Sequence, residues 1–320
     1  MEEQHQAVVV DCDHSSIEIE REVLRDVCGE VPWLACKTED EIIGQCAEAE
    51  GMLLQYAPAT RRVLEKLPRC KVIARYGVGV DTVDLEAASE RGIVICNVPD
   101  YGTEEVSDHA LALMLALTRR IVPANALVRS GRWDCSLLQP IFRHQVQTIG
   151  IIGLGRIGQA MARKTHALGM KVIGHDPYPP SSGLPGYITP TGLDELLRKA
   201  DVVSVHCPLN DQTRHLLDEA RLALMKPTAY LVNTARGHIV DEEALDRLLG
   251  GKKLAGAAMD VLAKEPGPAD HPLFRHDNFL CTPHMAWNSE ESARELKRKA
   301  AEEVRTVLLG GAPRYQVNRF

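Results

Sequence analysis

Three residues in the second half of the sequence carry side chains that could bind an anion and transfer a proton. Arg236, Glu265 and His284 come at or just after the runs "LVNTA", "MDVLAKE" and "FLCTP". A guanidinium can clamp a carboxylate through paired donors, an imidazole can protonate a nascent alkoxide, and a neighbouring carboxylate can orient that imidazole. Together they suit the reduction of a 2-oxo acid. Each alone is equally compatible with a surface arginine, a solvated loop carboxylate or a core histidine.

A glycine-rich segment predicts a site for the hydride donor. In "TIGIIGLGRIGQAMARKTHALGMKVIGHDPY", an apolar run is followed by the pattern Gly153-x-Gly155-x-x-Gly158 and then by a helical stretch. These glycines suit a tight turn, close approach of a pyrophosphate, and close packing of helix on strand. Asp176 ends the next strand about 20 residues on, where a carboxylate binds ribose hydroxyls. Because it would repel a 2′-phosphate, NAD(H) is expected in preference to NADP(H).

A second glycine-rich segment, "RYGVGVD" at 75–81, follows another apolar run. Its N–H groups could form a small nest for a substrate carboxylate, or it could be a plain turn between a strand and a helix. Its tyrosine is expected to face the same cleft and to affect specificity. The tryptophan of "CTPHMAW" is expected either to form a wall of the substrate pocket or to anchor the start of a helix. The predicted substrate-binding residues are Tyr76, Gly77, Val78, Gly79 and Trp287.

The composition argues against nucleic acid and membrane as partners. The chain has 320 residues and a formal net charge of −7, so it is long enough for two domains and lacks the basic excess of a nucleic-acid-binding protein. Its acidic start is unlike a signal peptide, and its longest apolar run is far below the roughly 20 residues of a membrane helix. The nine cysteines include no C-x-x-C pair. A reduced cytoplasmic protein without a metal site is expected.

Short β-rich runs alternate with helical stretches throughout, which predicts parallel sheets covered by helices. The expected strands are 7–12, 51–56, 71–75, 92–98, 148–153, 171–176, 201–207, 229–235, 254–261 and 278–283. One long helix is expected at about 104–130 and a final helix at about 289–309. The predicted fold is α/β with two Rossmann-like parallel-sheet domains and a cleft between them. The substrate domain is discontinuous (1–99 and 286–320), and the dinucleotide-binding domain is 100–285.

From about residue 50 onward the sequence resembles the D-isomer-specific 2-hydroxyacid dehydrogenases. The matching stretches are "RYGVGVDTVD", "GIVICNVPDYGTEEVSDHAL", "GIIGLGRIGQA", "VSVHCPLNDQTRHLL", "LVNTARGHIVDEEAL", "GAAMDVLAKEP" and "CTPHMAW". The resemblance implies hydride transfer between NAD(H) and C2 of a D-2-hydroxy or 2-oxo acid, with His284 as general acid/base, Glu265 as its partner and Arg236 on the substrate. It also implies domain closure about a hinge and a homodimer formed through the cofactor domain.

The same resemblance implies a set of residues around the cofactor, with Asp260 approaching the nicotinamide end. The expected cofactor-binding residues are Thr103, Gly153, Gly155, Arg156, Ile157, Gly158, Asp176, His206, Cys207, Pro208, Thr213, Thr234, Ala235, Arg236, Asp260 and His284.

Two other functions remain open within the resemblance. The stretch "CTPHMAWNSEESARELKRKAAEEVR" is most similar to the C-terminal binding protein branch, next to the phosphoglycerate dehydrogenases. One alternative is therefore an NAD(H)-sensing, corepressor-like interaction protein with weak or vestigial dehydrogenase activity. Another is an enzyme for a non-carboxylate substrate such as phosphite or formate. The complete Arg–Glu–His set favours the 2-hydroxyacid enzyme. Since the chain ends soon after the last expected helix, no C-terminal regulatory domain is expected.

Overall fold

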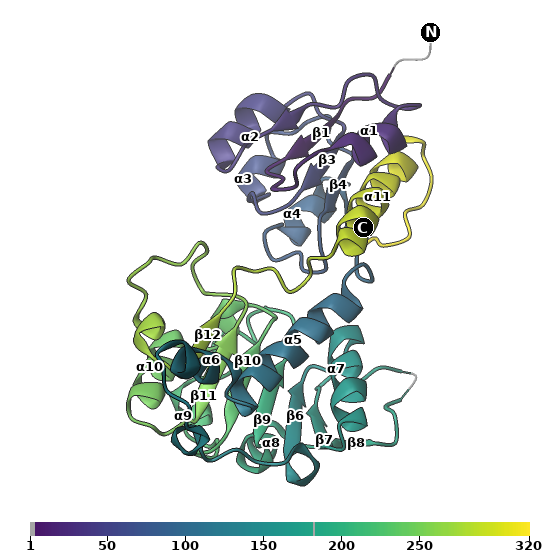
Figure 1. The fold of residues 1–320 in the computed structure, drawn as a ribbon. Helices are drawn as coiled ribbons and strands as arrows, with labels where there is room; N and C mark the ends of the chain where they lie inside the picture. The colour runs from purple at the N-terminus through teal and green to yellow at the C-terminus, as the bar shows by residue number, and fades with distance from the viewer. Residues whose placement is uncertain (1–3, 182) are drawn as a thin grey trace. The chain divides into compact units, whose positions relative to one another are not determined.

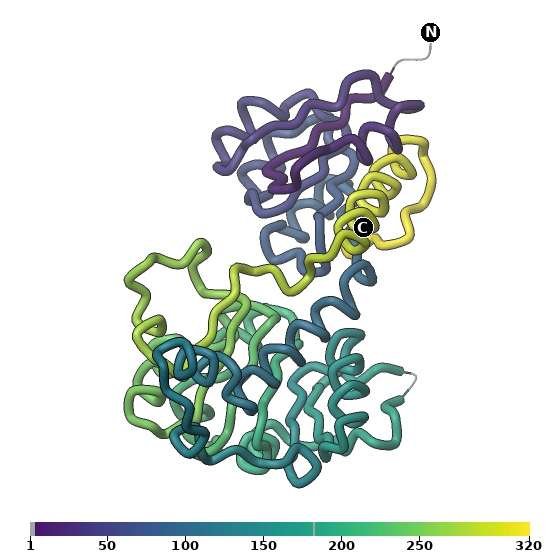
Figure 2. Tube along the Cα trace, viewed as in Figure 1, coloured from purple at the N-terminus to yellow at the C-terminus, as the bar shows by residue number. Residues whose placement is uncertain are grey.

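The computed structural model describes residues 4–181 and 183–320, which form two compact units. Unit 1 runs to Gly102 and resumes at Ser289–Phe320, whereas unit 2 is Thr103–Asn288. Figures 1 and 2 show the yellow C-terminal segment packed beside the purple N-terminal segment within unit 1. Both junctions fall three residues after the boundaries predicted from the sequence, 99/100 and 285/286.

Unit 1 is built on a five-stranded parallel sheet in the order β2-β1-β3-β4-β5. The strands are β1 (Ala7–Val10), β2 (Trp33–Leu34), β3 (Gly51–Leu54), β4 (Val72–Arg75) and β5 (Val94–Cys96). The helices are α1 (Glu18–Leu24), α2 (Glu39–Cys46), α3 (Arg61–Leu64), α4 (Leu85–Glu90) and α11 (Glu290–Leu308). Apolar residues of α2, α3 and α4 share one core with alternate strand residues, while α11 packs on β3, β4 and β5 beside α1.

Unit 2 contains a seven-stranded parallel sheet in the order β12-β11-β10-β9-β6-β7-β8. The strands are β6 (Thr148–Ile152), β7 (Lys171–His175), β8 (Ile188–Pro190), β9 (Val202–Val205), β10 (Tyr230–Asn233), β11 (Gly256–Met259) and β12 (Phe279–Cys281). The helices are α5 (Thr103–Thr118), α6 (Ile121–Arg129), α7 (Arg156–Ala167), α8 (Leu193–Lys199), α9 (Glu219–Leu222) and α10 (Glu242–Gly250). The short 3₁₀ segments are η1 (Cys135–Leu138), η2 (His144–Val146), η3 (Gly237–Ile239) and η4 (Pro272–Arg275).

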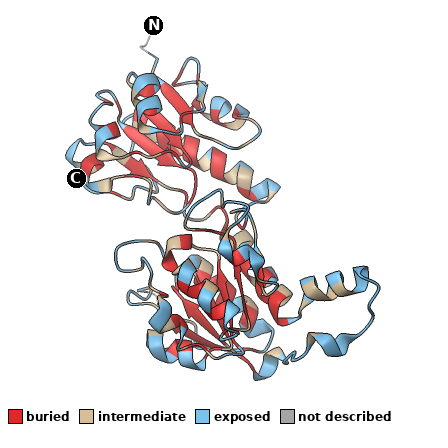
Figure 3. Ribbon diagram, turned by 90° about the vertical axis from the view of Figure 1, so that its left-hand side faces the viewer, coloured by how far each residue is buried: buried red, intermediate tan, exposed pale blue. Residues whose placement is uncertain are grey.

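Two apolar cores cover the two faces of this sheet. One core joins β-strand residues to α5 and α7, and the other joins the alternate strand residues to α8, α9 and α10. Figure 3 shows the strands as a buried layer between helices whose outer faces are exposed. Because both faces are covered, the strands are continuous apolar runs rather than alternating ones, which is why most of them could be predicted from the sequence. The prediction of two parallel-sheet α/β domains is confirmed.

The single long helix expected at 104–130 is wrong. The structure divides it into α5 and α6, which meet at a bend of 55°, and Arg120 between them has a left-handed φ of 57°. Pro123 explains the break, because a proline inside a continuous helix would lack an N–H and would clash with the carbonyl four residues earlier. In α6 it lies in the first turn, where neither cost applies.

The edge strands β2 and β8 were not predicted. Each pairs with a single neighbour, and their residues are partly exposed, so neither produces the apolar run of a buried strand. Among the described residues, no single helix is long and apolar enough to cross a membrane; the bent pair α5–α6 passes such a test by length and composition only.

Candidate active site

The carboxyl ends of the strands in unit 2 collect the predicted site residues at one edge of the sheet. All seven strands are parallel, so the segment that follows each strand emerges at that edge. The chain passes from β6 to β7 and β8 on one side and then crosses to β9 on the other, which makes the β6–β9 boundary the switch point where ligands bind in such folds. The residues that follow the strands are Gly153, Asp176, His206, Thr234, Ala235, Arg236, Asp260 and His284.

The glycine loop after β6 is tightly confined at two of its three glycines. Gly153 has a φ of 90°, and a Cβ there would lie 2.5 Å from the backbone N of Cys207. A Cβ on Gly158 would lie 1.9 Å from the carbonyl oxygen of Gly153. Around Gly155, which caps the start of α7, there is open space. The loop therefore leaves a cradle at a helix N-terminus, a geometry that suits a pyrophosphate.

Asp176 is fixed against this loop. Its Oδ2 accepts a hydrogen bond from the N–H of Leu154 at 2.7 Å, and its Oδ1 accepts one from the N–H of Tyr178 at 2.8 Å. The carboxylate thus stands at the end of β7 beside the cradle, where it can meet the ribose of a bound dinucleotide.

The loop after β9 lines the other side of the switch point. Burial lowers the pKa of His206 to about 4, so its ring is neutral, and its Nε2 lies 2.8 Å from Oγ of Ser204. Thr213 Oγ1 donates to the carbonyl of Pro208 at 2.7 Å and closes the loop. The loop therefore lies beside the glycine loop, because the backbone of Cys207 occupies the position next to Gly153 that a Cβ would need. It carries four of the expected cofactor residues: His206, Cys207, Pro208 and Thr213.

Four further expected cofactor residues lie nearby in unit 2. Thr103 and Arg156 line a cavity of about 400 Å³ beside the start of α7, and Ile157 is the second residue of that helix. Thr234 directly follows β10, and within the described part of the chain its buried hydroxyl has no hydrogen-bond partner. A buried hydroxyl of this kind is expected to find a partner when a ligand binds.

His284 and Glu265 are in direct contact. Nδ1 of His284 lies 2.6 Å from Oε2 of Glu265, and Oε1 of Glu265 accepts a hydrogen bond from the N–H of Leu262 at 2.9 Å. Burial acts to raise the pKa of Glu265, but the bond and charge of His284, the Leu262 N–H and the charge of Arg236 together hold that pKa below its usual value. A carboxylate bonded to one ring nitrogen fixes the orientation and tautomer of a histidine.

Arg236 is brought to the same edge by a close backbone approach. A Cβ on Gly237 would lie 2.0 Å from the carbonyl carbon of Leu262, so only glycine lets η3 pack against the loop that carries Glu265. Nη1 of Arg236 donates to the carbonyl of Ala235 at 2.8 Å. The backbone carbonyl of Arg236 accepts a hydrogen bond from Nδ2 of Asn233 at 2.9 Å. The guanidinium lies close enough to Glu265 to act on its pKa.

The turn that carries His284 is held by Asp260, whose side chain is only 1% exposed. Its Oδ1 accepts from the N–H of Met285 at 3.0 Å and from Oγ1 of Thr282 at 2.5 Å, and its Oδ2 accepts from the N–H of Ala286 at 2.8 Å. Its side chain therefore supports the turn from inside. Each carboxylate oxygen can accept more than one hydrogen bond, so the expectation that Asp260 approaches the nicotinamide end stays a prediction.

Trp287 is also attached to this turn. Its Nε1 donates to the carbonyl of His284 at 3.1 Å, and its side chain is partly buried. The ring is therefore anchored directly to the backbone of the histidine.

In unit 1, the loop 77–79 follows shortly after the end of β4. Gly77 has a φ of 129°, its carbonyl accepts from the N–H of Val98 at 2.9 Å, and the carbonyl of Val78 accepts from Nδ2 of Asn97 at 2.7 Å. No residue that the structure describes accepts a hydrogen bond from the N–H groups of Gly77, Val78 or Gly79. The side chain of Val78 is 42% exposed, so the loop offers free donors at the surface of this unit.

The expectation that Tyr76 faces a cleft is wrong. Its side chain is 2% exposed, and its hydroxyl donates to Oε1 of Glu20 at 2.8 Å inside unit 1. Nζ of Lys297 on α11 lies 3.7 Å from Oε2 of the same carboxylate. Burial and the nearby Glu20 raise the pKa of Tyr76 far above its usual value. The ring thus anchors the start of the loop 77–79 to the interior, where a side chain cannot select a substrate.

The matched family model accounts for most of unit 2. Residues 111–286 match the model described as D-isomer specific 2-hydroxyacid dehydrogenase, NAD binding domain. Among solved structures, the chain is similar to a D-lactate dehydrogenase from Aquifex aeolicus complexed with NAD and lactic acid. The TM-score is 0.88 at 28% sequence identity, with 95% of this chain and 96% of that chain covered.

Curated relatives cover nearly the whole sequence. The chain is 38% identical over 299 residues to a D-3-phosphoglycerate dehydrogenase of Methanocaldococcus jannaschii, which covers 92% of this chain and 56% of that protein. It is 40% identical over 264 residues to a glyoxylate reductase of Thermofilum pendens, which covers 80% and 77%. The chain thus spans about half the length of the phosphoglycerate dehydrogenases that it matches. On the family model and these relatives, the chain belongs to the D-isomer specific 2-hydroxyacid dehydrogenase family.

Proposed function

We propose that this chain is an NAD-dependent D-2-hydroxyacid dehydrogenase, or 2-oxoacid reductase. The observation that carries the proposal is the His284–Glu265 pair, with Nδ1 and Oε2 2.6 Å apart, on the same sheet edge as the glycine loop. An interaction protein that only senses the dinucleotide would not need a histidine poised by a carboxylate with an arginine beside it.

When bound, NADH supplies the hydride that adds to C2 of the 2-oxo acid. His284 then gives the proton from Nε2 to the carbonyl oxygen, which yields the 2-hydroxy acid and NAD⁺, and Glu265 stabilises the charged imidazole before transfer. Arg236 supplies paired donors for the substrate carboxylate. The loop Gly77–Gly79 is proposed as a further set of donors for a carboxylate, on the strength of its free N–H groups.

Asp176 supports a preference for NAD(H) over NADP(H). Its carboxylate is fixed by two backbone N–H groups beside the glycine loop, so it cannot readily turn away from a 2′-phosphate. Like charges held at close range cost binding free energy in a partly buried site.

The first prediction concerns substrate and cofactor. The purified protein is expected to oxidise NADH with at least one of glyoxylate, pyruvate, hydroxypyruvate, phosphohydroxypyruvate, phenylpyruvate and 4-methylthio-2-oxobutyrate. Turnover with NADPH is expected to be at least about tenfold lower, which corresponds to about 1.4 kcal/mol. Faster turnover of the bulky apolar acids would support Trp287 as a pocket wall. Binding of NADH without any turnover would instead favour the interaction protein or a non-carboxylate substrate.

The second prediction concerns the proton. His284→Ala is expected to lower kcat by roughly 10²–10⁴-fold because the general acid is lost, with NADH affinity close to normal. A matched control is His276→Ala, since Nε2 of His276 is likewise paired with a carboxylate, Oδ1 of Asp246 at 2.7 Å, but at the amino end of β12. That control is expected to keep its kcat. Near-full turnover in the His284 variant would remove this residue from the mechanism.

The pH profile tests the partner of His284. The pKa of Glu265 lies below its usual value, so the carboxylate stays ionised at neutral pH, and its support of the charged imidazole is lost only as the pH falls through that low pKa. In Glu265→Gln this support is absent at every pH. The high-pH limit of the reduction rate is therefore expected to move to lower pH, and an unshifted profile would contradict the pairing.

The third prediction separates the roles of two glycines. Gly153→Ala places a Cβ against the backbone of residues 206–207 at a φ of 90° and is expected to cost about 2 kcal/mol of unfolding free energy. Gly155→Ala meets open space, so its stability should stay close to that of the unsubstituted protein. Its affinity for NADH should nevertheless fall about tenfold or more, because the methyl group occupies the cradle. Thermal unfolding and NADH titration measure both, and unchanged affinity in Gly155→Ala would contradict the proposed cradle.

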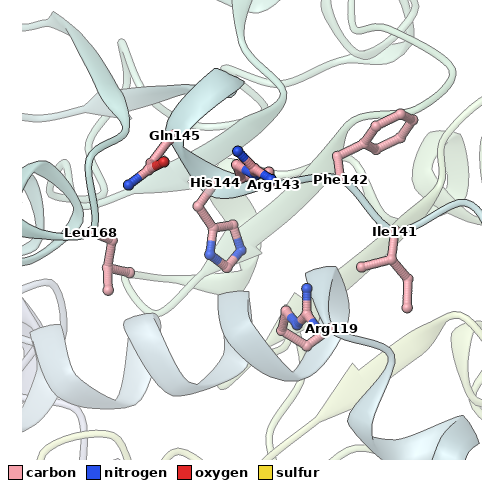
Figure 4. Close-up of a pocket in the computed structure, with 7 residues that line it drawn as sticks. All are labelled: Arg119, Ile141, Phe142, Arg143, His144, Gln145 and Leu168. Carbon is pink, nitrogen blue, oxygen red and sulfur yellow. The ribbon is translucent and has the colours of Figure 1, made fainter.

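A homodimer through unit 2 is supported by an exposed arm. No residue in 121–146, which comprises α6, η1 and η2, is buried, and the apolar side chains of Ile121 and Trp133 are 57% and 88% exposed. Figure 3 shows this helix and loop extending from the rest of the unit. At its base, a cavity of about 680 Å³ is lined by Arg119, Ile141, Phe142, Arg143, His144, Gln145 and Leu168 (Figure 4). So much exposed apolar surface marks an interaction site, and we propose a second copy of the chain as its occupant.

The fourth prediction tests this dimer. Analytical ultracentrifugation is expected to give about twice the chain mass of 35.3 kDa, and Ile121→Glu on α6 is expected to shift the protein to the monomer by burying an unpaired charge. Leu309→Glu is the control, since Leu309 is similarly exposed (56%) but lies at the end of α11 in unit 1. A monomeric unsubstituted protein would contradict the proposal.

A further inference from the structure

His109 on α5 contacts the support of the catalytic turn although it is distant from it in sequence. Its Nε2 lies 2.9 Å from Oγ1 of Thr282, 173 positions away, and 3.6 Å from Oδ1 of Asp260. The imidazole is 20% exposed, and all three residues belong to unit 2. Neither the glycine motif nor the Arg–Glu–His set includes this histidine.

The direction of these hydrogen bonds follows from counting protons. The hydroxyl of Thr282 has one proton, and its oxygen lies 2.5 Å from Oδ1 of Asp260. That carboxyl group already accepts the N–H groups of Met285 and Ala286, so it acts as the acceptor and Thr282 as the donor. The hydroxyl oxygen must then accept from His109, whose Nε2 carries the proton.

The donated hydrogen bonds converge on Asp260, which also holds the backbone of His284. The N–H of His284 donates to the carbonyl of Asp260 at 2.7 Å, while the Asp260 carboxyl group accepts the next two N–H groups of the turn. His284 itself has a φ of 51°, a left-handed conformation that costs on the order of 1 kcal/mol or more for a non-glycine residue. The turn keeps this conformation because Asp260 holds both its backbone and its following residues.

We propose that His109 is a positioning residue for His284. By donating to Thr282 it fixes the hydroxyl proton toward Asp260, and Asp260 in turn holds the 282–286 turn so that the imidazole meets Glu265. His109 touches no reacting atom in this scheme and acts through Thr282 and Asp260. The inference rests on the proposed acid/base role of His284.

Substitutions at position 109 separate the hydrogen bond from mere packing. His109→Leu removes the donor and is expected to lower kcat about tenfold, as expected for the loss of a single buried hydrogen bond to a polar network, with NADH affinity within about twofold of normal. His109→Gln is expected to restore kcat to within about threefold, because its amide nitrogen reaches nearly as far as Nε2 and can donate. His109→Asn is too short to reach and should behave like the leucine variant.

A control on the same helix accounts for general loosening of α5. Thr118 is 3% exposed, and its hydroxyl donates to the carbonyl of Met114 at 2.8 Å at the far end of the helix. Thr118→Val removes this contact and the one with Nε2 of His144 at 3.0 Å without touching the Asp260 network, and it is expected to leave kcat unchanged. A loss of kcat in this control equal to that of His109→Leu would overturn the positioning role.

Double variants test the route through Thr282. Thr282→Val is expected to lower kcat by at least as much as His109→Leu, and the double variant should fall no further than Thr282→Val alone. Effects that multiply would overturn the inference, because His109 would then act by another path. Hydrogen exchange at the amides of Met285 and Ala286 gives a second readout in any variant that folds, and it should speed up in His109→Leu and not in His109→Gln.

The His284→Ala variant distinguishes a failure of the proposed function from a failure of the positioning role. If its turnover is intact, the proposed function fails, whatever position 109 does. If its turnover collapses while His109→Leu keeps full kcat, only the positioning role is overturned. If His284 is the general acid and His109 acts only by positioning it, adding His109→Leu to His284→Ala should cause no further loss of kcat.

Discussion

The site depends first on the parallel register of the sheet in unit 2. Because seven strands run in one direction, every connecting segment that follows a strand emerges at the same edge. Gly153, Asp176, Arg236, Asp260 and His284 are spread over much of the chain and yet share that edge. Strand pairing therefore decides which side chains meet, and the local loops decide only how each side chain is turned.

Carboxylate side chains then fix those loops, and they do so mainly through backbone N–H groups. Asp176 accepts two of them at the glycine loop, Asp260 accepts two at the histidine turn, and Glu265 accepts one from Leu262. Each carboxylate holds the loop that carries it against a neighbouring segment. A bond to a backbone N–H defines loop geometry more narrowly than apolar packing, because its energy falls steeply with angle. This explains how short, irregular segments can hold side chains in place.

The sequence predicted most of the strands and the segments after them that carry the candidate site residues. The elements and side chains that it predicted wrongly, or did not predict, have identifiable physical causes. Continuous apolar runs mark strands buried on both faces, whereas β2 and β8 lie at edges and produce no such run. Pro123 was the signal for the break after α5, and it was overlooked within an otherwise helical stretch. Tyr76 was misplaced because its hydroxyl pairs with Glu20, 56 positions away, which the local sequence does not indicate. His109 was missed because its hydrogen-bond partner, Thr282, lies 173 positions away in the sequence. No local sequence pattern indicates such a contact.

The left-handed backbone conformation of His284 is linked to the orientation of its imidazole ring. A histidine at a φ of 51° is unfavourable in isolation, so the surrounding bonds must outweigh that cost before substrate arrives. In this conformation Nδ1 of the ring lies 2.6 Å from Oε2 of Glu265. Because Asp260 already holds this turn through three hydrogen bonds, the imidazole is oriented in the protein itself, and the proton transfer that we propose for it requires little reorganisation. Gly153 and Gly237 also position their loops before any ligand binds. Each lacks a side chain at a point where the backbone of a neighbouring loop lies too close for a Cβ atom.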